Sequence, residues 1–151
     1  MRGFWVLVHV LGFTLWLGGG IATMVAGVSA KSFAPAERLA AYKLIGAIQR
    51  ILVGPGAMAV LLSGLVLAMP YMKQGAVPSW MGLMMIAGIL GALAAVAISV
   101  PTAAKLARLE VDARGGLPEA FQALRKRQIF AATIAGTFGL IAMFAVTLGK
   151  W

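Results

Sequence analysis

Residues 4–29 read FWVLVHVLGFTLWLGGGIATMVAGVS, an apolar run without Lys, Arg, Asp or Glu. Three further runs, at about residues 51–70, 80–100 and 129–149, share this property. Each is close to the roughly 20 apolar residues that an α-helix needs to cross a bilayer. Hydrophobic residues make up 62% of the 151 positions, and the mean hydropathy is +0.96. The sequence therefore predicts an all-α, polytopic membrane protein: one domain over residues 1–151, built as a bundle of four transmembrane helices.

A cleaved secretory signal is the alternative interpretation of the first run. Arg2 precedes the run, and Val28-Ser29-Ala30 resembles a small-residue cleavage site. The run is longer than a typical signal core, however, and it carries His9 and Trp16 on one helical face. We therefore expect the first span to be retained in the bundle.

Basic residues fall mostly on one side of the predicted spans. The connections after spans one and three hold ten of the thirteen Lys and Arg residues, whereas Arg2, Lys73 and Lys150 lie on the other side. Because cytoplasmic loops are enriched in Lys and Arg, this split predicts that these two connections are cytoplasmic and that both termini are outside. The basic residues have no aromatic residues interleaved with them, which favours anionic membrane lipids over nucleic acid as their partner.

Prolines and glycines mark the expected boundaries of the helices. Pro35 predicts the start of an amphipathic helix that leads into span two, and Pro55 is expected to bend that span. Pro70 is expected to help close the outer loop, and Pro101 to end or kink span three. The turn at residues 115–118, GGLP, is expected to split the inner loop into two short helical pieces.

Small residues at helical spacing predict close packing between the spans. In span one, Gly12 and Gly20 share a face with His9 and Trp16. Such faces let helix backbones approach one another in lipid, where no hydrophobic force drives association. We expect helix packing along them unless a ligand fills the groove. Comparable stripes in spans three and four comprise Gly88, Gly91, Ala92, Ala95, Ser99, Thr133, Gly136, Thr137 and Leu140.

His9 is the sole histidine and the only ionisable side chain well inside a predicted span. A polar side chain in hydrocarbon is costly and usually faces the bundle interior. At 1.5 Å of rise per residue, His9 would lie about 7 Å below the outer interface. A neutral imidazole is a good ligand for haem iron or copper, and thioether sulfur suits Cu(I) or haem iron. Six of the nine methionines fall in the same outer half: Met69, Met72, Met81, Met84, Met85 and Met143.

The predicted cofactor site combines a nitrogen ligand, an opening for a flat macrocycle and sulfur ligands. The candidate cofactor-binding residues are His9, Gly12, Trp16, Gly20 and Arg50, and the metal ligands are His9, Met84, Met85 and Met143. Arg50 lies near the opposite face from His9 and is a separate candidate for binding a propionate or quinone head group. The cofactor would be haem b or copper. Alternative roles are a structural hydrogen bond from His9 to a neighbouring helix, gap filling by the methionines, and contact of Arg50 with lipid phosphates.

The segment at residues 9–19, HVLGFTLWLGG, resembles the first-span signature of a group of small bacterial integral membrane proteins. Arg50, Pro55 and the tripeptide at residues 63–65, SGL, resemble the second-span pattern of that group. The group includes the membrane domain of copper-resistance protein D, the HemJ-type protoporphyrinogen oxidase, and an uncharacterised integral membrane family of about this length. In the oxidase, the resemblance implies that His9 binds haem or porphyrin with help from a basic residue in span three. Residues 80–100 contain no Lys or Arg, so the resemblance places the chain nearest the uncharacterised branch.

Two functional hypotheses remain open. In the first, His9 binds haem, porphyrin or copper for redox chemistry or metal handling. In the second, the bundle is a non-catalytic subunit or scaffold that packs against a second copy or against other membrane subunits. A proton-coupled exporter is disfavoured because no predicted span holds a carboxylate, and a hydrolase because no acid lies near His9 to orient it.

Overall fold

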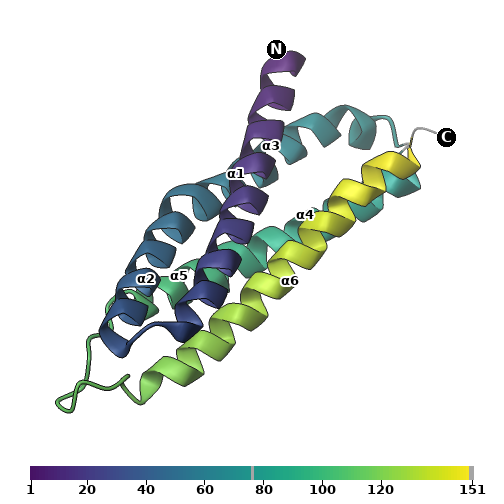
Figure 1. The fold of residues 1–151 in the computed structure, drawn as a ribbon. Helices are drawn as coiled ribbons and strands as arrows, with labels where there is room; N and C mark the ends of the chain where they lie inside the picture. Colours follow the sequence, from purple (N-terminus) through teal and green to yellow (C-terminus); the bar gives the residue numbers. More distant parts are fainter. Residues whose placement is uncertain (76, 150–151) are drawn as a thin grey trace.

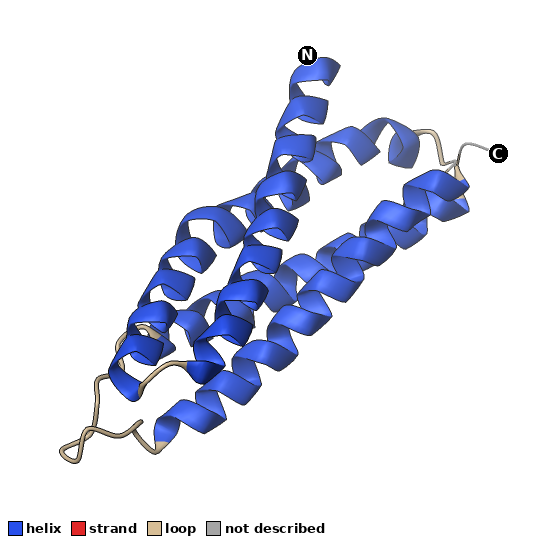
Figure 2. Cartoon of the chain, viewed as in Figure 1, coloured by secondary structure: helices blue, strands red, loops and turns tan. Residues whose placement is uncertain are grey.

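The structure is a computed structural model that describes residues 1–75 and 77–149. Every regular element in this part of the chain is a helix (Figure 2). Four continuous helical units are long and apolar enough to cross a membrane: Arg2–Ser32, Pro35–Lys73, Ser79–Leu106 and Ala120–Leu148. The prediction of an all-α chain with four long apolar helices is therefore confirmed.

Three of the four units contain more than one helical segment. In chain order the segments are α1 (Arg2–Ser29), the 3-10 turn η1 (Ala30–Ser32), α2 (Pro35–Ile48), the π-helical turn η2 (Gln49–Val53), α3 (Gly54–Lys73), α4 (Ser79–Leu93), the π-helical turn η3 (Ala94–Ser99), α5 (Val100–Leu106) and α6 (Ala120–Leu148). Helix α1 begins and α6 ends at one end of the bundle, opposite the connections that follow α1 and α5 (Figure 1). We call the end with these two connections the inner end.

The helices associate mainly as two pairs. Helix α1 packs along α3, and α4 packs along α6, whereas α1 and α6 touch only sparsely. At the inner end α2 also packs against α5. Helices α1 and α6 are therefore the least closely packed of these helix pairs. The candidate site described below lies between them.

The helices extend beyond the predicted spans at the inner end. The unit predicted to cross at residues 51–70 begins at Pro35, and the unit predicted at 129–149 begins at Ala120. The predicted amphipathic helix from Pro35 is confirmed, because α2 buries one face against α5 and α6. Large side chains fill this region, which we call the inner cluster: Leu39, Tyr42, Ile45, Leu106 and Phe121.

The prolines within the helices do not end them. The π-helical turns η2 and η3 directly precede the helical turns that hold Pro55 and Pro101. Proline lacks an N–H group, and its ring clashes with the carbonyl four residues earlier, so a locally widened turn accommodates it. Pro101 was predicted to end or kink span three; it does not end it, because the helix continues to Leu106. Pro70 likewise lies inside α3 instead of in the outer loop.

The connection between α5 and α6 is a loop. Oδ1 of Asp112 accepts hydrogen bonds from the backbone N–H groups of Arg114 at 2.9 Å and Gly116 at 2.7 Å. Gly115 has a φ of +76°, which glycine adopts without strain. This turn competes with helix formation and lies between α5 and the start of α6, so the predicted split of the inner loop into two helical pieces is confirmed. The two pieces continue the apolar helical units instead of forming isolated helices.

Candidate functional site

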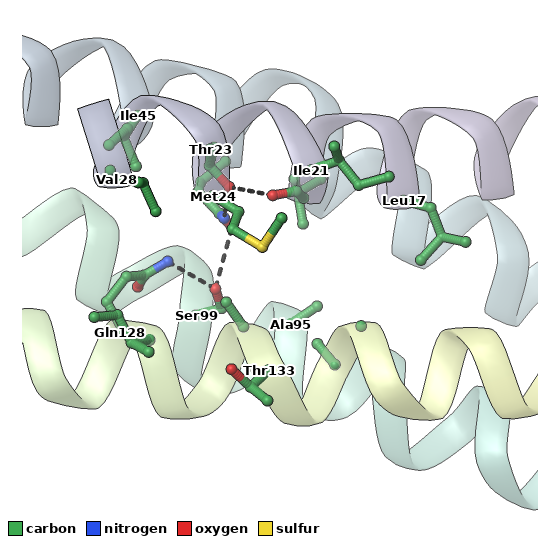
Figure 3. Close-up of a pocket in the computed structure, with 18 of the residues that line it drawn as sticks. Leu17, Ile21, Thr23, Met24, Val28, Ile45, Ala95, Ser99, Gln128 and Thr133 are labelled. Carbon is green, nitrogen blue, oxygen red and sulfur yellow. Dashed lines mark hydrogen bonds between the residues drawn. The ribbon is translucent and has the colours of Figure 1, made fainter. Parts of the chain in front are cut away.

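A cavity of about 490 Å³ lies between α1 and α6. Its volume is within the range of small-molecule sites, and its walls are mostly apolar. Residues of η1, α2, η2 and η3 complete the lining. Figure 3 shows side chains of α1 and α6 on opposite sides of the space: Leu17, Ile21, Met24 and Val28 on one side, and Gln128 and Thr133 on the other.

A chain of buried polar side chains crosses this cavity, with one residue from each helical unit (Figure 3). Nε2 of Gln128 donates to Oγ of Ser99 at 2.9 Å. Oγ of Ser99 donates to Oε1 of Gln49 at 3.2 Å. Nε2 of Gln49 donates to Oγ1 of Thr23 at 3.2 Å, and Thr23 donates to the carbonyl of Gly20 at 2.9 Å. We call Thr23, Gln49, Ser99 and Gln128 the polar chain.

The polar chain leaves one acceptor unused. Gln128 is only 6% exposed, and its Oε1 has no hydrogen-bond partner within the described residues. Flipping the amide would set Oε1 against Oγ of Ser99, whose single hydrogen is already donated to Gln49. A buried acceptor without a partner costs about 1–3 kcal/mol. One residue of the cavity lining therefore carries a buried acceptor that no described residue satisfies.

The two π-helical turns position the middle of the polar chain. Gln49 is the first residue of η2, and Ser99 is the last residue of η3. Both side chains are about 1% exposed and meet between the second and third helical units. π-Helical turns are rare and often occur at functional sites. Their meeting at the cavity supports its selection as the candidate site.

His9 lies between α1 and α3 and is not among the residues that line the cavity. Its Nδ1 is 3.0 Å from Oγ of Ser63, and a Cβ built on Gly64 would be 3.1 Å from its Cε1. Ser63 also donates to the backbone carbonyl of Ala59. The predicted alternative role of His9, a hydrogen bond to a neighbouring helix, is thus the geometry observed, with serine as its partner. Ligation by His9 stays a prediction.

The structure separates the other predicted cofactor-binding residues. Trp16 and Gly20 line the cavity. Gly12 lies against α3, and a Cβ there would be 2.9 Å from the carbonyl oxygen of Gly56, so a macrocycle at Gly12 would have to displace α3. Arg50 is exposed on η2 and is not a lining residue. Only two of these four residues therefore share a site.

The predicted sulfur ligands lie in the other helix pair from His9. Met84 and Met85 are half-buried on α4, and Met143 is 57% exposed on α6. Helices α4 and α6 pack along one another, whereas His9 belongs to the pair formed by α1 and α3. The described residues contain no group of three or more His, Cys, Asp or Glu side chains that could hold a metal ion.

Sequence reasoning did not predict the polar chain or the cavity. Its signal was nevertheless present, since Thr23, Gln49, Ser99 and Gln128 each lie near the inner end of one predicted span. Of these residues, Ser99 was predicted only as a member of a packing face of span three. Uncharged polar residues at one common depth in all four spans indicate a shared hydrogen-bonded layer, because lipid offers them no partner.

The chain was compared with protein-family models, with curated proteins and with solved structures. None of the three comparisons found a match. The resemblance of residues 9–19 and 50–65 to small bacterial membrane proteins therefore stays a prediction, and the cavity is interpreted from this chain alone.

Proposed function

We propose that this chain is an integral protein of the bacterial inner membrane with both termini outside. Its outward faces are apolar, and Phe130 and Phe144 on α6 are 68% and 70% exposed. Water disfavours such a continuous surface, whereas lipid accepts it. The inner end carries ten of the thirteen basic residues; the opposite end has Arg2 and Lys73, and Lys150 is outside the described residues.

A reporter fused after the last residue tests this topology. Alkaline phosphatase, which is active only when exported, is expected to be active there, and a reporter fused in the loop between α5 and α6 is expected to be inactive. The reverse pattern would refute the proposed orientation.

We further propose that the bundle binds one amphipathic molecule in the cavity between α1 and α6. The unpartnered Oε1 of Gln128 carries this proposal, because it is a buried acceptor on a residue that lines a mostly apolar space. A suitable ligand has an apolar body and one O–H or N–H group that donates to Gln128. The small lining residues leave room for it, since a Cβ added to Gly20 or Gly136 meets no described atom within 4 Å.

Quenching of Trp16 fluorescence tests the proposed binding. Trp16 lines the cavity yet is only 2% exposed, so a quencher in bulk lipid or detergent reaches it poorly. The experiment uses a variant that keeps Trp16 and replaces the other tryptophans: Trp5→Phe, Trp80→Phe and Trp151→Phe. The probes are a fatty alcohol with bromine on its chain and the methyl ether of that alcohol. Both enter apolar spaces, but only the alcohol donates a hydrogen bond.

The alcohol is expected to quench Trp16 more strongly than the ether. Gln128→Leu should remove that difference, because it removes the acceptor. Gln122→Leu is the matched control, since this glutamine lies on the exposed surface of α6 outside the cavity. Equal quenching by the two probes in the unsubstituted background, or an equal effect of both leucine variants, would refute the proposal.

A second candidate function is the binding of haem b, porphyrin or copper through His9. The bond between His9 and Ser63 supports it, because histidine ligands commonly have their second ring nitrogen held by a hydrogen bond. If Ser63 donates to Ala59, Nδ1 of His9 carries the hydrogen and Nε2 keeps the lone pair that ligation requires.

An absorption spectrum and a metal analysis of the purified protein test this candidate. Protein made with ample haem or copper should show a Soret band or stoichiometric copper that His9→Ala abolishes. Ser63→Ala should weaken binding by about 10–100-fold, as is typical when the partner of a ligating histidine is removed. A colourless, metal-free protein under both supplies would refute it. Failure of both binding proposals would leave a scaffold that packs against a second copy or other membrane subunits.

A further inference from the structure

The inner mouth of the cavity is positively charged. Lys31 and Arg125 line it, and none of the described lining residues is acidic. Lys31 follows α1 in η1, and Arg125 lies on α6, so the two cations flank the gap between these helices. An anionic group at this mouth would be attracted from both sides, and the low dielectric of the neighbouring apolar walls would strengthen the attraction.

Arg125 is held in position by the inner cluster. Its Nε donates to the hydroxyl of Tyr42 at 3.1 Å. Tyr42 is 4% exposed, and its ring lies edge-on to that of Phe121 with the centroids 5.1 Å apart. The bond uses only Nε, and the terminal NH₂ groups of the guanidinium have no partner in the described part of the chain. A pre-oriented guanidinium of this kind suits phosphate, which it binds through two parallel hydrogen bonds.

The cavity has the length and polarity of one lipid leaflet. It reaches from the cations at the inner mouth to Leu17 on α1. The helix rises about 21 Å between Lys31 and Leu17 at 1.5 Å per residue, which is comparable to half of a bilayer including its headgroups. Gln128 lies one turn from Arg125 on the same helix, so its Oε1 is near the charged mouth and not at the apolar far end.

We propose that the occupant of this cavity is an anionic phospholipid of the inner leaflet. Arg125 and Lys31 bind its phosphate, and an acyl chain fills the apolar part of the cavity beyond Gln128. This inference rests on the proposed function, because it names the class of amphipathic molecule that the cavity takes.

Brominated phospholipids in vesicles test the headgroup preference. The single-Trp16 protein is reconstituted in phosphatidylcholine that contains either brominated phosphatidylglycerol or brominated phosphatidylcholine. The phosphatidylglycerol probe is expected to quench Trp16 at lower lipid fraction. The double variant Lys31→Gln/Arg125→Gln should weaken its binding by about tenfold, since hydrogen bonds between charged groups are the strong ones.

The matched control is Lys126→Gln/Arg127→Gln, which removes the same charge from exposed neighbours that do not line the cavity. The control is expected to keep the preference for phosphatidylglycerol. An equal loss in both double variants would assign the preference to general surface charge and overturn the inference. Equal quenching by the two lipids would also overturn it while leaving the proposed function intact. If neither lipid nor the fatty alcohol quenches Trp16, the proposed function itself fails.

Free phosphate is the alternative source of the same chemistry. Inorganic phosphate at millimolar concentration is added to the vesicles with the phosphatidylglycerol probe. Quenching is expected to persist, because the acyl chain contributes to lipid binding. Full reversal of the quenching by phosphate would show that the mouth binds the free anion, and would overturn the assignment to lipid.

Discussion

Helix α1 makes two contacts of opposite character. Against α3 it is closed: a Cβ on Gly56 would lie 2.7 Å from the carbonyl oxygen of Gly12 and 2.7 Å from the backbone nitrogen of Trp16. Against α6 it is open, and a Cβ on Gly20 meets no described atom within 4 Å. The same residue type therefore permits helix packing at one face and leaves a cavity at the next.

The difference shows what glycine stripes do in lipid. Glycine allows two backbones to approach, and dispersion contacts then hold the helices together. Where the facing helix lies further away, a glycine leaves volume for a ligand. The polar side chains around that volume form hydrogen bonds with one another. Four predictions test the difference between the closed contact and the open contact.

The largest expected effect is that of Gly56→Ala. The added Cβ would meet backbone atoms of α1, which cannot rotate away, so α1 and α3 must separate. Overpacking of this kind costs about 1–3 kcal/mol, and we expect the upper end of that range. The measurement is the free energy of unfolding in detergent, followed by circular dichroism. Gly88→Ala is the control, since its Cβ meets no described atom within 4 Å. Equal stability of the two variants would contradict a closed contact between α1 and α3.

Gln49→Leu should have the second-largest effect on the free energy of unfolding, and it acts at the open contact between α1 and α6. Gln49 donates to Thr23 and accepts from Ser99, so its loss leaves the buried hydroxyl of Ser99 without its acceptor. An unpaired buried polar group costs about 1–3 kcal/mol. Gln128→Leu, measured by the same unfolding assay, should cost less because it removes a single bond along with the unpartnered oxygen. If Gln128→Leu is the more damaging change, the polar chain does not hold the units together as described.

Ser63→Ala should have a smaller effect on the closed side. It removes the bond to His9, which is worth about 0.5–1.5 kcal/mol. Thr14→Ala is the control, because the hydroxyl of Thr14 bonds only to the carbonyl of Val10 in its own helix. A double-mutant cycle with His9→Ala isolates the coupling. Zero coupling energy would show that the contact between His9 and Ser63 does not stabilise the pair of helices.

Of these substitutions, Gly20→Ala should change the free energy of unfolding least. Its clearest effect should be weaker ligand binding. The new methyl group clashes with no described atom, and alanine favours helix over glycine by up to about 1 kcal/mol. It nevertheless occupies the cavity wall, so quenching of Trp16 by the brominated alcohol should fall. Gly18→Ala brings the same helix preference at an exposed position outside the cavity, and should leave quenching unchanged. Loss of stability in Gly20→Ala would contradict an open contact between α1 and α6.

Much of the architecture followed from the sequence. The absence of charge over four runs of about 20 residues predicts four long apolar helices, and Pro35 marks the start of α2. The helix ends were less predictable. Residues 120–128 include Arg125, Lys126 and Arg127, yet they continue α6 because Phe121 is buried in the inner cluster and stabilises the first turns. Tertiary packing thus extends the helices beyond the ends predicted from local hydropathy.

The candidate site was predicted only in part. The sequence placed Trp16 and Gly20 on one face of span one, and both line the cavity. It also placed His9 there, but a face of a helix about 100° wide contacts more than one neighbour, and His9 faces Ser63 of α3.

The sequence by itself determined that this chain forms apolar helices and where its basic residues lie, because both properties depend on local composition and on the length of uncharged runs. Only the tertiary structure decided which glycines meet a backbone and which leave a cavity, since that depends on which helix faces each residue. It also brought Thr23, Gln49, Ser99 and Gln128 together from four separate helices. The common depth of these residues is visible in the sequence, but the pairing of each donor with its acceptor is not, because it depends on the distance and rotation of whole helices.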